Sequence, residues 1–170
     1  MLLNLHSYFS LRYGTLSLQD LISGMLAGGY DTAVLTDINK SSGSLDFIKL
    51  GRAAGLNLLA GMEFRKGDQI CIVAIAKNEQ GFREINEYRT RLNMENRAVP
   101  ERAPGFDQVF VIYPFHKIDG FVLRDFEYIG IRQRERTKAQ LMERRILDRC
   151  VIKQASMFGT VLTPFLFPLF

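Results

Sequence analysis

Short apolar runs alternate along this chain with stretches in which apolar residues recur at helical spacing. One run, at residues 2–5, ends in His6 and Ser7, and another, at residues 34–35, ends in Thr36 and Asp37. Runs of this kind are typical of buried strands, and a helical pattern follows each of them. Repeated strand–helix units with polar residues at the strand ends are the layout of α/β enzymes, whose sites collect at the C-terminal edge of a sheet or barrel.

Capping and turn residues mark where several elements begin and end. Ser17 is a typical helix N-cap, Asp20 can bond back to the free N–H groups of that first turn, and Asn78 can cap a later helix. Gly67 and Asp68 indicate a turn at residues 65–68, and residues 93–107 are expected to form an exposed loop. Strands are expected at residues 2–6, 32–36, 56–63, 70–76, 109–113 and 127–131, with a seventh starting at 150–152, and helices at 17–27, 45–54, 80–92 and 135–149.

Composition narrows the class of protein. The 170 residues are 47% hydrophobic, which indicates a globular chain that fits one domain or part of one. The net charge of +4 is a weak argument for a nucleic-acid partner. Cys71 and Cys150 show no paired spacing, so we expect no disulfide framework or zinc knuckle, and a reducing cytoplasm is the default compartment. No signal peptide is expected, because Met1 leads directly into strand-like sequence.

A series of motifs follows in a characteristic order. They are Asn4-Leu5-His6-Ser7, Tyr8-Phe9-Ser10-Leu11-Arg12-Tyr13-Gly14, Leu35-Thr36-Asp37-Ile38-Asn39, Gly61-Met62-Glu63-Phe64, Ala76-Lys77-Asn78-Glu79-Gln80-Gly81-Phe82 and Tyr128-Ile129-Gly130-Ile131-Arg132. In these motifs the chain resembles the polymerase-and-histidinol-phosphatase (PHP) domain, and most closely the PHP domain at the N-terminus of bacterial DNA polymerase III alpha subunits. The similarity runs from residue 1 to about residue 153.

The resemblance implies an α/β fold, a distorted (β/α) barrel of seven strands that is similar to a TIM barrel. The chain is too short to close such a barrel, so we expect an incomplete one with about six to seven strands. Residues 1–153 would form the N-terminal part of the PHP domain, and residues 154–170 an aberrant apolar tail outside the family pattern. The chain is therefore expected to be a truncated fragment. The tail is too short and too proline-interrupted for a transmembrane helix, which needs about 20 apolar residues.

The resemblance also implies a metal cluster that this chain has largely lost. In metal-binding PHP domains, histidines and carboxylates from several strand ends hold two or three divalent ions, which activate a water and clamp a phosphoryl group. The family ligands retained here are His6, Asp37 and Glu63. The positions where a family ligand is replaced are Asn4, Tyr13, Ile38 and Cys71. Because several ligands must converge to hold an ion, we expect a vestigial site, with zinc or manganese as the ion if it binds one.

The retained residues also have structural explanations. His6 and Asp37 can form a hydrogen-bonded pair at the strand ends. Glu63 can form a salt bridge with Arg65 or Lys66. On these explanations the three side chains stabilise the fold and hold no ion.

Arginines are frequent in and just before the predicted helix at residues 135–149. They could contact phosphates of a nucleic acid. The alternative is a solvated helix face with Leu141, Met142 and Ile146 turned inward. The arginines considered for nucleic-acid contact are Arg132, Arg134, Arg144 and Arg145.

The function that the resemblance implies is that of an N-terminal piece of a replicative DNA polymerase III alpha subunit. The parent would be a DNA-directed DNA polymerase that uses magnesium, with its catalytic carboxylates in later domains. The loss of ligands favours a PHP domain that is catalytically degenerate and needs no cofactor of its own. Its partners would be the remaining polymerase domains, a proofreading exonuclease subunit, and DNA through the parent, with no membrane involved. The alternatives are a free-standing metal-dependent PHP phosphoesterase and a non-enzymatic interaction module.

Overall fold

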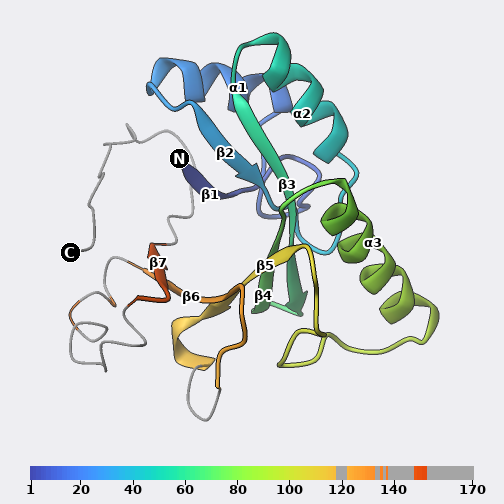
Figure 1. Ribbon diagram of the computed structural model, residues 1–170. Helices are drawn as coiled ribbons and strands as arrows, with labels where there is room; N and C mark the ends of the chain where they lie inside the picture. Colours follow the sequence, from blue (N-terminus) through green and yellow to red (C-terminus); the bar gives the residue numbers. More distant parts are fainter. Residues whose placement is uncertain (118–121, 133–134, 136, 138–147, 153–170) are drawn as a thin grey trace.

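The computed structural model describes residues 1–117, 122–132, 135, 137 and 148–152. Strands and helices alternate through residues 2–66, as the apolar pattern predicts (Figure 1). The strands are β1 (Leu2–Leu5), β2 (Thr32–Leu35), β3 (Asn57–Lys66), β4 (Gln69–Ala76), β5 (Val109–Pro114), β6 (Glu127–Ile131) and β7 (Cys150–Ile152). The helices are α1 (Leu18–Ala27), α2 (Ser44–Ala53), α3 (Glu79–Met94) and the 3₁₀ turn η1 (Phe115–Lys117).

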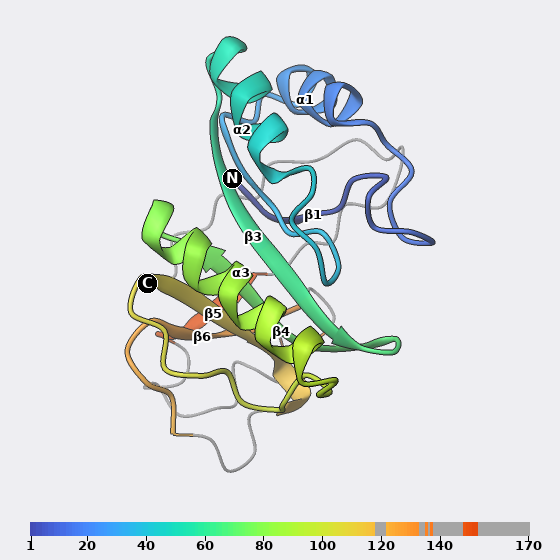
Figure 2. The same cartoon turned by 90° about the vertical axis from the view of Figure 1, so that its right-hand side faces the viewer.

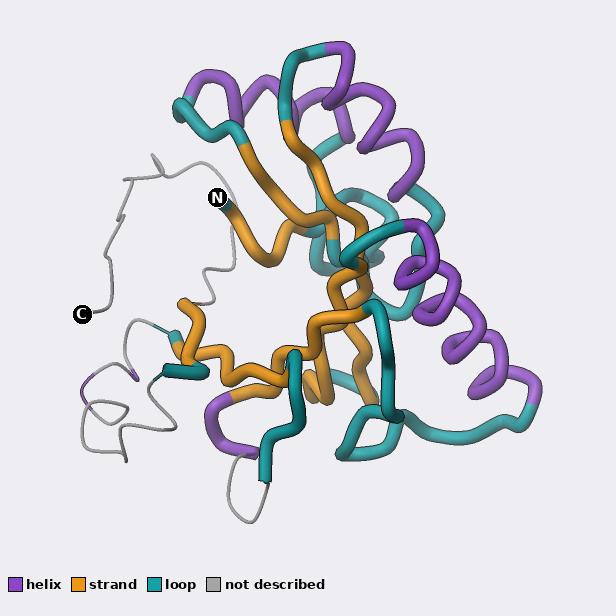
Figure 3. The backbone as a smooth tube through the Cα atoms, in the orientation of Figure 1, coloured by secondary structure: helices purple, strands orange, loops and turns teal. Residues whose placement is uncertain are grey.

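The described strands form one seven-stranded sheet in sequence order, from β1 to β7. β1, β2 and β3 are parallel neighbours, as are β5, β6 and β7, whereas β4 runs antiparallel to both β3 and β5. The sheet curls into an open half barrel with the helices on its outside (Figure 3). The expectation of an incomplete, barrel-like α/β fold with six to seven strands is confirmed. The carboxyl ends of β1, β2 and β3 meet at one edge of this sheet.

The helices bury the outer face of the sheet in two clusters. α1 and α2 contribute Leu21, Met25 and Phe47 to one cluster, over β1, β2 and β3. α3 contributes Ile85 and Tyr88 to the other, over β3, β4 and β5. Figure 2 shows the long strand β3 running between the pair α1 and α2 on one side and α3 on the other.

The local signals at the helix starts are confirmed. The Ser17 hydroxyl accepts a hydrogen bond from the Asp20 N–H, and the Asp20 carboxylate accepts one from the Ser17 N–H, which completes a capping box for α1. The Asn78 side chain accepts a hydrogen bond from the Gly81 N–H at the start of α3. Each of these helices therefore begins where its capping residue predicts.

Two connections differ from their predictions. β3 continues to Lys66, which pairs with Gln69, so the turn expected at residues 65–68 is reduced to Gly67 and Asp68. Gly67 has a φ of +57°, the conformation that the first turn position of a two-residue type II′ hairpin requires. In the loop after α3, Val99 and Ala103 are buried in the cluster beneath that helix, so this loop is not exposed throughout.

Some predictions fall outside the described residues. The basic helix expected at residues 135–149 lies mostly there, and the tail expected at 154–170 lies there entirely. In the part of the chain that the structure describes, no helix is both long enough and apolar enough to cross a bilayer. Cys71 and Cys150 are both buried, and neither forms a disulfide within the described residues.

Candidate functional site

The backbone that follows β2 joins the end of β1 to β3. On one side the Thr36 N–H donates to the Leu5 carbonyl at 2.9 Å, and on the other the Asn39 N–H donates to the Glu63 carbonyl at 2.9 Å. The carboxyl ends of these neighbouring strands are thereby held side by side. The expected ligands that this brings to one edge of the sheet are His6, Asp37 and Glu63.

Asp37 uses its carboxylate to hold the loop that follows β1. Its Oδ1 accepts hydrogen bonds from the Ser7 N–H at 2.8 Å and the Ser10 hydroxyl at 2.6 Å, and its Oδ2 accepts one from the Ser7 hydroxyl at 2.7 Å. Asp37 is 0% exposed, so these partners replace water completely. The expected hydrogen-bonded pair of His6 and Asp37 was wrong, because the loop folds the two serines onto this carboxylate instead.

Glu63 is paired with a cation from its own strand. Its side chain is 0% exposed, and its Oε1 lies 2.5 Å from Arg65 Nε. Residues two apart on a strand share a face, which is why Arg65 can reach this carboxylate. The predicted salt bridge of Glu63 with Arg65 is confirmed. On the other side, His6 Nε2 lies 3.6 Å from Glu63 Oε2 and has no hydrogen-bond partner among the described residues.

Two residues from other segments, Asn39 and Tyr13, contact Arg65. The Asn39 side chain accepts a hydrogen bond from the Arg65 N–H at 3.0 Å and donates one to the Arg65 carbonyl at 3.1 Å. The Arg65 guanidinium lies 4.0 Å from the centre of the Tyr13 ring, a cation–π contact. The Tyr13 hydroxyl in turn donates to Asp68 Oδ1, and this hydrogen bond is the main reason that the pKa of Tyr13 is raised.

The positions where the family ligands are replaced have other contacts. Asn4 is 1% exposed, and its Oδ1 accepts the Thr36 hydroxyl at 2.8 Å, while its Nδ2 has no hydrogen-bond partner in the described structure. Ile38 forms a bridge with Glu63 through its backbone. Cys71 is an extra residue in β4, between the pairs Arg65–Ile70 and Phe64–Ile72, and its side chain lies in the cluster beneath α3.

The donor set does not fit a metal ion. All the oxygens of Asp37 accept hydrogen bonds from serines, and Glu63 is already neutralised by Arg65. An ion would have to break one of these sets of contacts, since a metal needs free lone pairs from several converging ligands. Within the described ranges, no group of three or more His, Cys, Asp or Glu side chains could hold an ion.

The arginines considered for nucleic-acid contact are mostly beyond the structural description. Arg132 is exposed, and its backbone N–H donates to the Glu135 side chain at 2.8 Å. Its exposure leaves a phosphate contact open as a prediction. The other arginines considered, Arg134, Arg144 and Arg145, lie outside the described residues.

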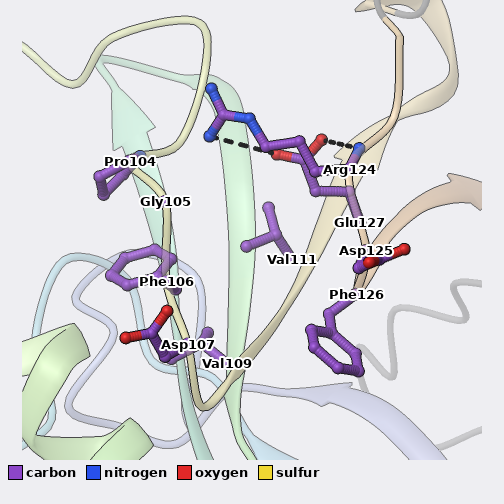
Figure 4. Close-up of a pocket in the computed structure, with 10 residues that line it drawn as sticks. All are labelled: Pro104, Gly105, Phe106, Asp107, Val109, Val111, Arg124, Asp125, Phe126 and Glu127. Atoms are coloured by element: carbon purple, nitrogen blue, oxygen red, sulfur yellow. Dashed lines mark hydrogen bonds and ion pairs between the residues drawn. The ribbon is translucent and has the colours of Figure 1, made fainter.

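A separate cavity of about 300 Å³ lies at the opposite edge of the sheet, between the loop before β5 and the segment at the start of β6 (Figure 4). Its buried carboxylate, Glu127, accepts hydrogen bonds from the Tyr113 hydroxyl at 2.9 Å and the Arg124 N–H at 2.8 Å. Burial is the main cause that raises the pKa of Tyr113 to about 12. The hydrogen bonds of Glu127 thus connect β5 to the start of β6, and we interpret their role as structural. The sequence had given no signal for it, because no spacing rule joins Tyr113 on β5 to Glu127 on β6.

A family model and two curated proteins match this chain in sequence. The family model described as the PHP domain matches residues 3–126. Over 83 residues the chain is 36% identical to the DNA polymerase III subunit alpha of Ureaplasma parvum serovar 3, which covers 49% of this chain and 8% of that protein. Over 130 residues it is 30% identical to an error-prone DNA polymerase of Symbiobacterium thermophilum, which covers 71% of this chain and 12% of that protein.

Among solved structures, the chain is similar to a predicted metal-dependent phosphoesterase from Bifidobacterium adolescentis. The TM-score is 0.39 and the sequence identity 20%, over 55% of this chain and 34% of that one. The two curated relatives are much longer proteins, and this chain spans only 8% and 12% of their lengths.

Proposed function

The chain belongs to the PHP domain family, and from this membership we propose that it is the N-terminal PHP region of a DNA polymerase of the polymerase III alpha type. In this role the domain supports the polymerase and docks partner proteins, and it does not hydrolyse phosphoesters. The parent protein would be a DNA-directed DNA polymerase that acts in replication.

Both curated relatives support the first part of this proposal. Each is a DNA polymerase, and the longer match covers 130 residues of the chain. The parent would use magnesium at carboxylates outside this chain and would contact DNA there. The partners proposed for this domain are the remaining polymerase domains and a proofreading exonuclease subunit, and its compartment is the cytoplasm.

The observation that carries the second part is the buried pair of Glu63 and Arg65. Glu63 is the family's bridging ligand in the resemblance, and a carboxylate that is neutralised by a guanidinium is poorly available to a metal ion. The hydrogen bonds that Asp37 accepts from Ser7 and Ser10 have the same effect on a second ligand. The arrangement therefore favours a structural pocket over one that activates water.

A phosphatase assay tests the absence of hydrolysis. The purified chain is incubated with a generic phosphomonoester and added manganese or zinc, beside a Glu63→Ala variant. The proposal expects no phosphate release above the rate given by the variant. Clear turnover that Glu63→Ala abolishes would instead identify a free-standing phosphoesterase.

The nucleotide sequence that follows codon 170 in the source genome tests the polymerase assignment. We expect polymerase domains to be encoded there. A genomic locus without any polymerase-coding sequence after the PHP region would contradict the assignment and favour the interaction module.

A further inference from the structure

We propose that three aromatic side chains and two cations at one edge of the sheet form a binding platform for single-stranded nucleic acid. The rings of Phe126, Phe110 and Tyr128 form an aromatic row, and the cations beside them are Lys77 and Arg149. The platform lies at the edge where β4 ends and β5 and β6 begin, opposite to the edge where β1, β2 and β3 end. The proposal goes beyond the proposed function and holds whether or not polymerase domains follow this chain.

The three rings of the aromatic row contact one another edge to face. The centre of the Phe110 ring is 6.0 Å from that of Phe126 and 5.9 Å from that of Tyr128. Phe110 and Tyr128 pack against Ile112 on the face of the sheet that alternates with the helix-covered one, and both are only partly buried. No described helix contributes to this cluster, so the row faces away from the helices.

Phe126 is the ring of the row that is best placed for stacking. It is 42% exposed, and it also borders the cavity in front of β5, so there is open space beside it (Figure 4). Its φ of +65° is a conformation that a bulky residue rarely adopts. The Phe126 carbonyl accepts a hydrogen bond from the Val111 N–H at 2.9 Å, which holds this backbone against β5. The burial of the ring does not explain why phenylalanine occupies this position, whereas a role in stacking does.

Lys77 supplies the first cation. Its Nζ lies 2.8 Å from the centre of the Phe126 ring and 5.0 Å from that of the Phe110 ring, which are cation–π contacts. The same Nζ donates a hydrogen bond to the Asp107 carbonyl at 3.3 Å. That acceptor carries no net charge, so the ammonium group is positioned beside the rings by neutral partners.

Arg149 supplies the second cation at the other end of the row. The Cζ atom of its guanidinium lies 5.8 Å from the centre of the Tyr128 ring. The carboxylate that faces it is Asp125, at 3.8 Å, and the two side chains are 37% and 91% exposed. An exposed ion pair of this kind contributes little, so a phosphate group could replace Asp125 as the partner of the guanidinium.

Rings and cations side by side match the two chemical parts of a single strand. Its unpaired bases stack on aromatic side chains almost regardless of sequence, and its phosphates are neutralised by lysine and arginine. The bases of a duplex are already stacked on one another and leave no face for the row. The platform should therefore prefer single strands and should show little preference for sequence.

The test is fluorescence anisotropy of a labelled oligothymidylate of about 15 nucleotides, which is near the upper site size of one single-strand-binding module. The 170-residue chain is titrated into this probe, and into a duplex of the same length, between about 50 and 200 mM salt. Phe126→Leu keeps an apolar side chain without a ring, Phe126→Tyr keeps the ring, and Lys77→Gln removes a charge. The controls are Tyr8→Ala, which removes a ring that is 46% exposed elsewhere, and Arg97→Gln, which removes an exposed cation.

We expect the unmodified chain to bind the single strand with a Kd of roughly 10–100 µM, the range of sequence-independent binding. Phe126→Leu should weaken binding by at least about fivefold, while Phe126→Tyr and Tyr8→Ala should bind like the unmodified chain. Lys77→Gln should make the slope of log K against log salt shallower by about 0.7, the value for one phosphate contact on a single strand. Arg97→Gln should leave this slope unchanged.

Three results would overturn the proposal: no binding of the single strand, equally tight binding of the duplex, or equal affinities of Phe126→Leu and Phe126→Tyr. Binding of neither probe would leave the row as a surface for a protein. Circular dichroism melts establish that each variant is folded. If Phe126→Leu is unfolded, the comparison of Lys77→Gln with Arg97→Gln decides, and equal salt slopes for these two variants would reject the platform.

Discussion

Asp37→Asn is the substitution that best separates a structural role of the strand-end carboxylates from a metal-binding one. The Asp37 carboxylate accepts three hydrogen bonds, from the Ser7 N–H, the Ser7 hydroxyl and the Ser10 hydroxyl. The amide of asparagine has nearly the same shape, so the substitution removes the charge without opening a cavity. It also places an NH₂ group where one carboxylate oxygen accepted a hydrogen bond.

The expected cost follows from these three contacts. A hydrogen bond to a charged acceptor contributes about 1.5–3 kcal/mol and a neutral one about 0.5–1.5 kcal/mol. Each of the three hydrogen bonds should weaken by about 1 kcal/mol when its acceptor loses the charge. The easier burial of an amide offsets part of this, so the free energy of unfolding should fall by about 2–3 kcal/mol. For a chain of this size each kcal/mol corresponds to about 2–4 °C, so the melting temperature should fall by about 4–12 °C.

The assays are urea unfolding and thermal unfolding, both monitored by circular dichroism, in EDTA and again with zinc. Asp31→Asn is the matched control, since Asp31 is an exposed aspartate at the start of β2, and a change there should stay within about 0.5 kcal/mol. A loss for Asp37→Asn that is the same with and without zinc supports the role of a loop clamp. The reasoning is refuted if Asp37→Asn is as stable as the control in EDTA, or if the unmodified chain alone gains stability from zinc.

Three further predictions test the fold around the pocket. Ser17→Ala, which removes the capping hydroxyl of α1, should lower the free energy of unfolding by about 1 kcal/mol in urea melts, and no change would argue against the capping box. Gly81→Ala would place its Cβ 1.9 Å from the Gln108 carbonyl oxygen and should lower the free energy of unfolding by about 2 kcal/mol or more. The control Gly105→Ala has open space around its Cβ and should be tolerated, and equal melting temperatures of the two variants would contradict this packing. Burial raises the pKa of Tyr113 to about 12 from 10.0, so the unfolded chain releases this proton first as the pH rises, and the contribution of Tyr113 to stability is present below about pH 10 and lost toward pH 12. In urea melts across this range, the free energy of unfolding should fall less for Tyr113→Phe than for the unmodified chain, and an equal fall with pH in both proteins would disprove it.

The parts of the fold that could be predicted are those set by local sequence. The capping box at Ser17 and the cap at Asn78 depend on residues three apart, and the apolar strand β6 was predicted at its observed bounds. The turn before β4 was predicted to be longer than it is. Charged residues at the end of a hairpin are typical of loops, but Arg65 and Lys66 still pair with β4. Propensity alone cannot tell an exposed strand end from a turn.

The parts of the site that could not be predicted depend on contacts between distant residues. A salt bridge of Glu63 with Arg65 or Lys66 was among the expectations. The structure shows the pair with Arg65, because β3 extends past Glu63 and places the two side chains on one strand face. The contacts of Asn39 and Tyr13 with Arg65 were not predicted. These two residues lie 26 and 52 positions earlier in the chain (65 − 39 and 65 − 13), and no spacing rule joins them to Arg65. His6 and Asp37 were brought to the same edge as predicted, but their partners were decided by how the intervening loop folds.

The metal content of the unmodified chain tests the central claim most directly. The purified protein is incubated with excess zinc and with excess manganese, dialysed against metal-free buffer, and examined by elemental analysis beside Glu63→Ala. If Arg65 supplies the positive charge of this pocket, both proteins should retain far less than one ion per chain. Two or more ions held by the unmodified chain and lost from Glu63→Ala would contradict the account.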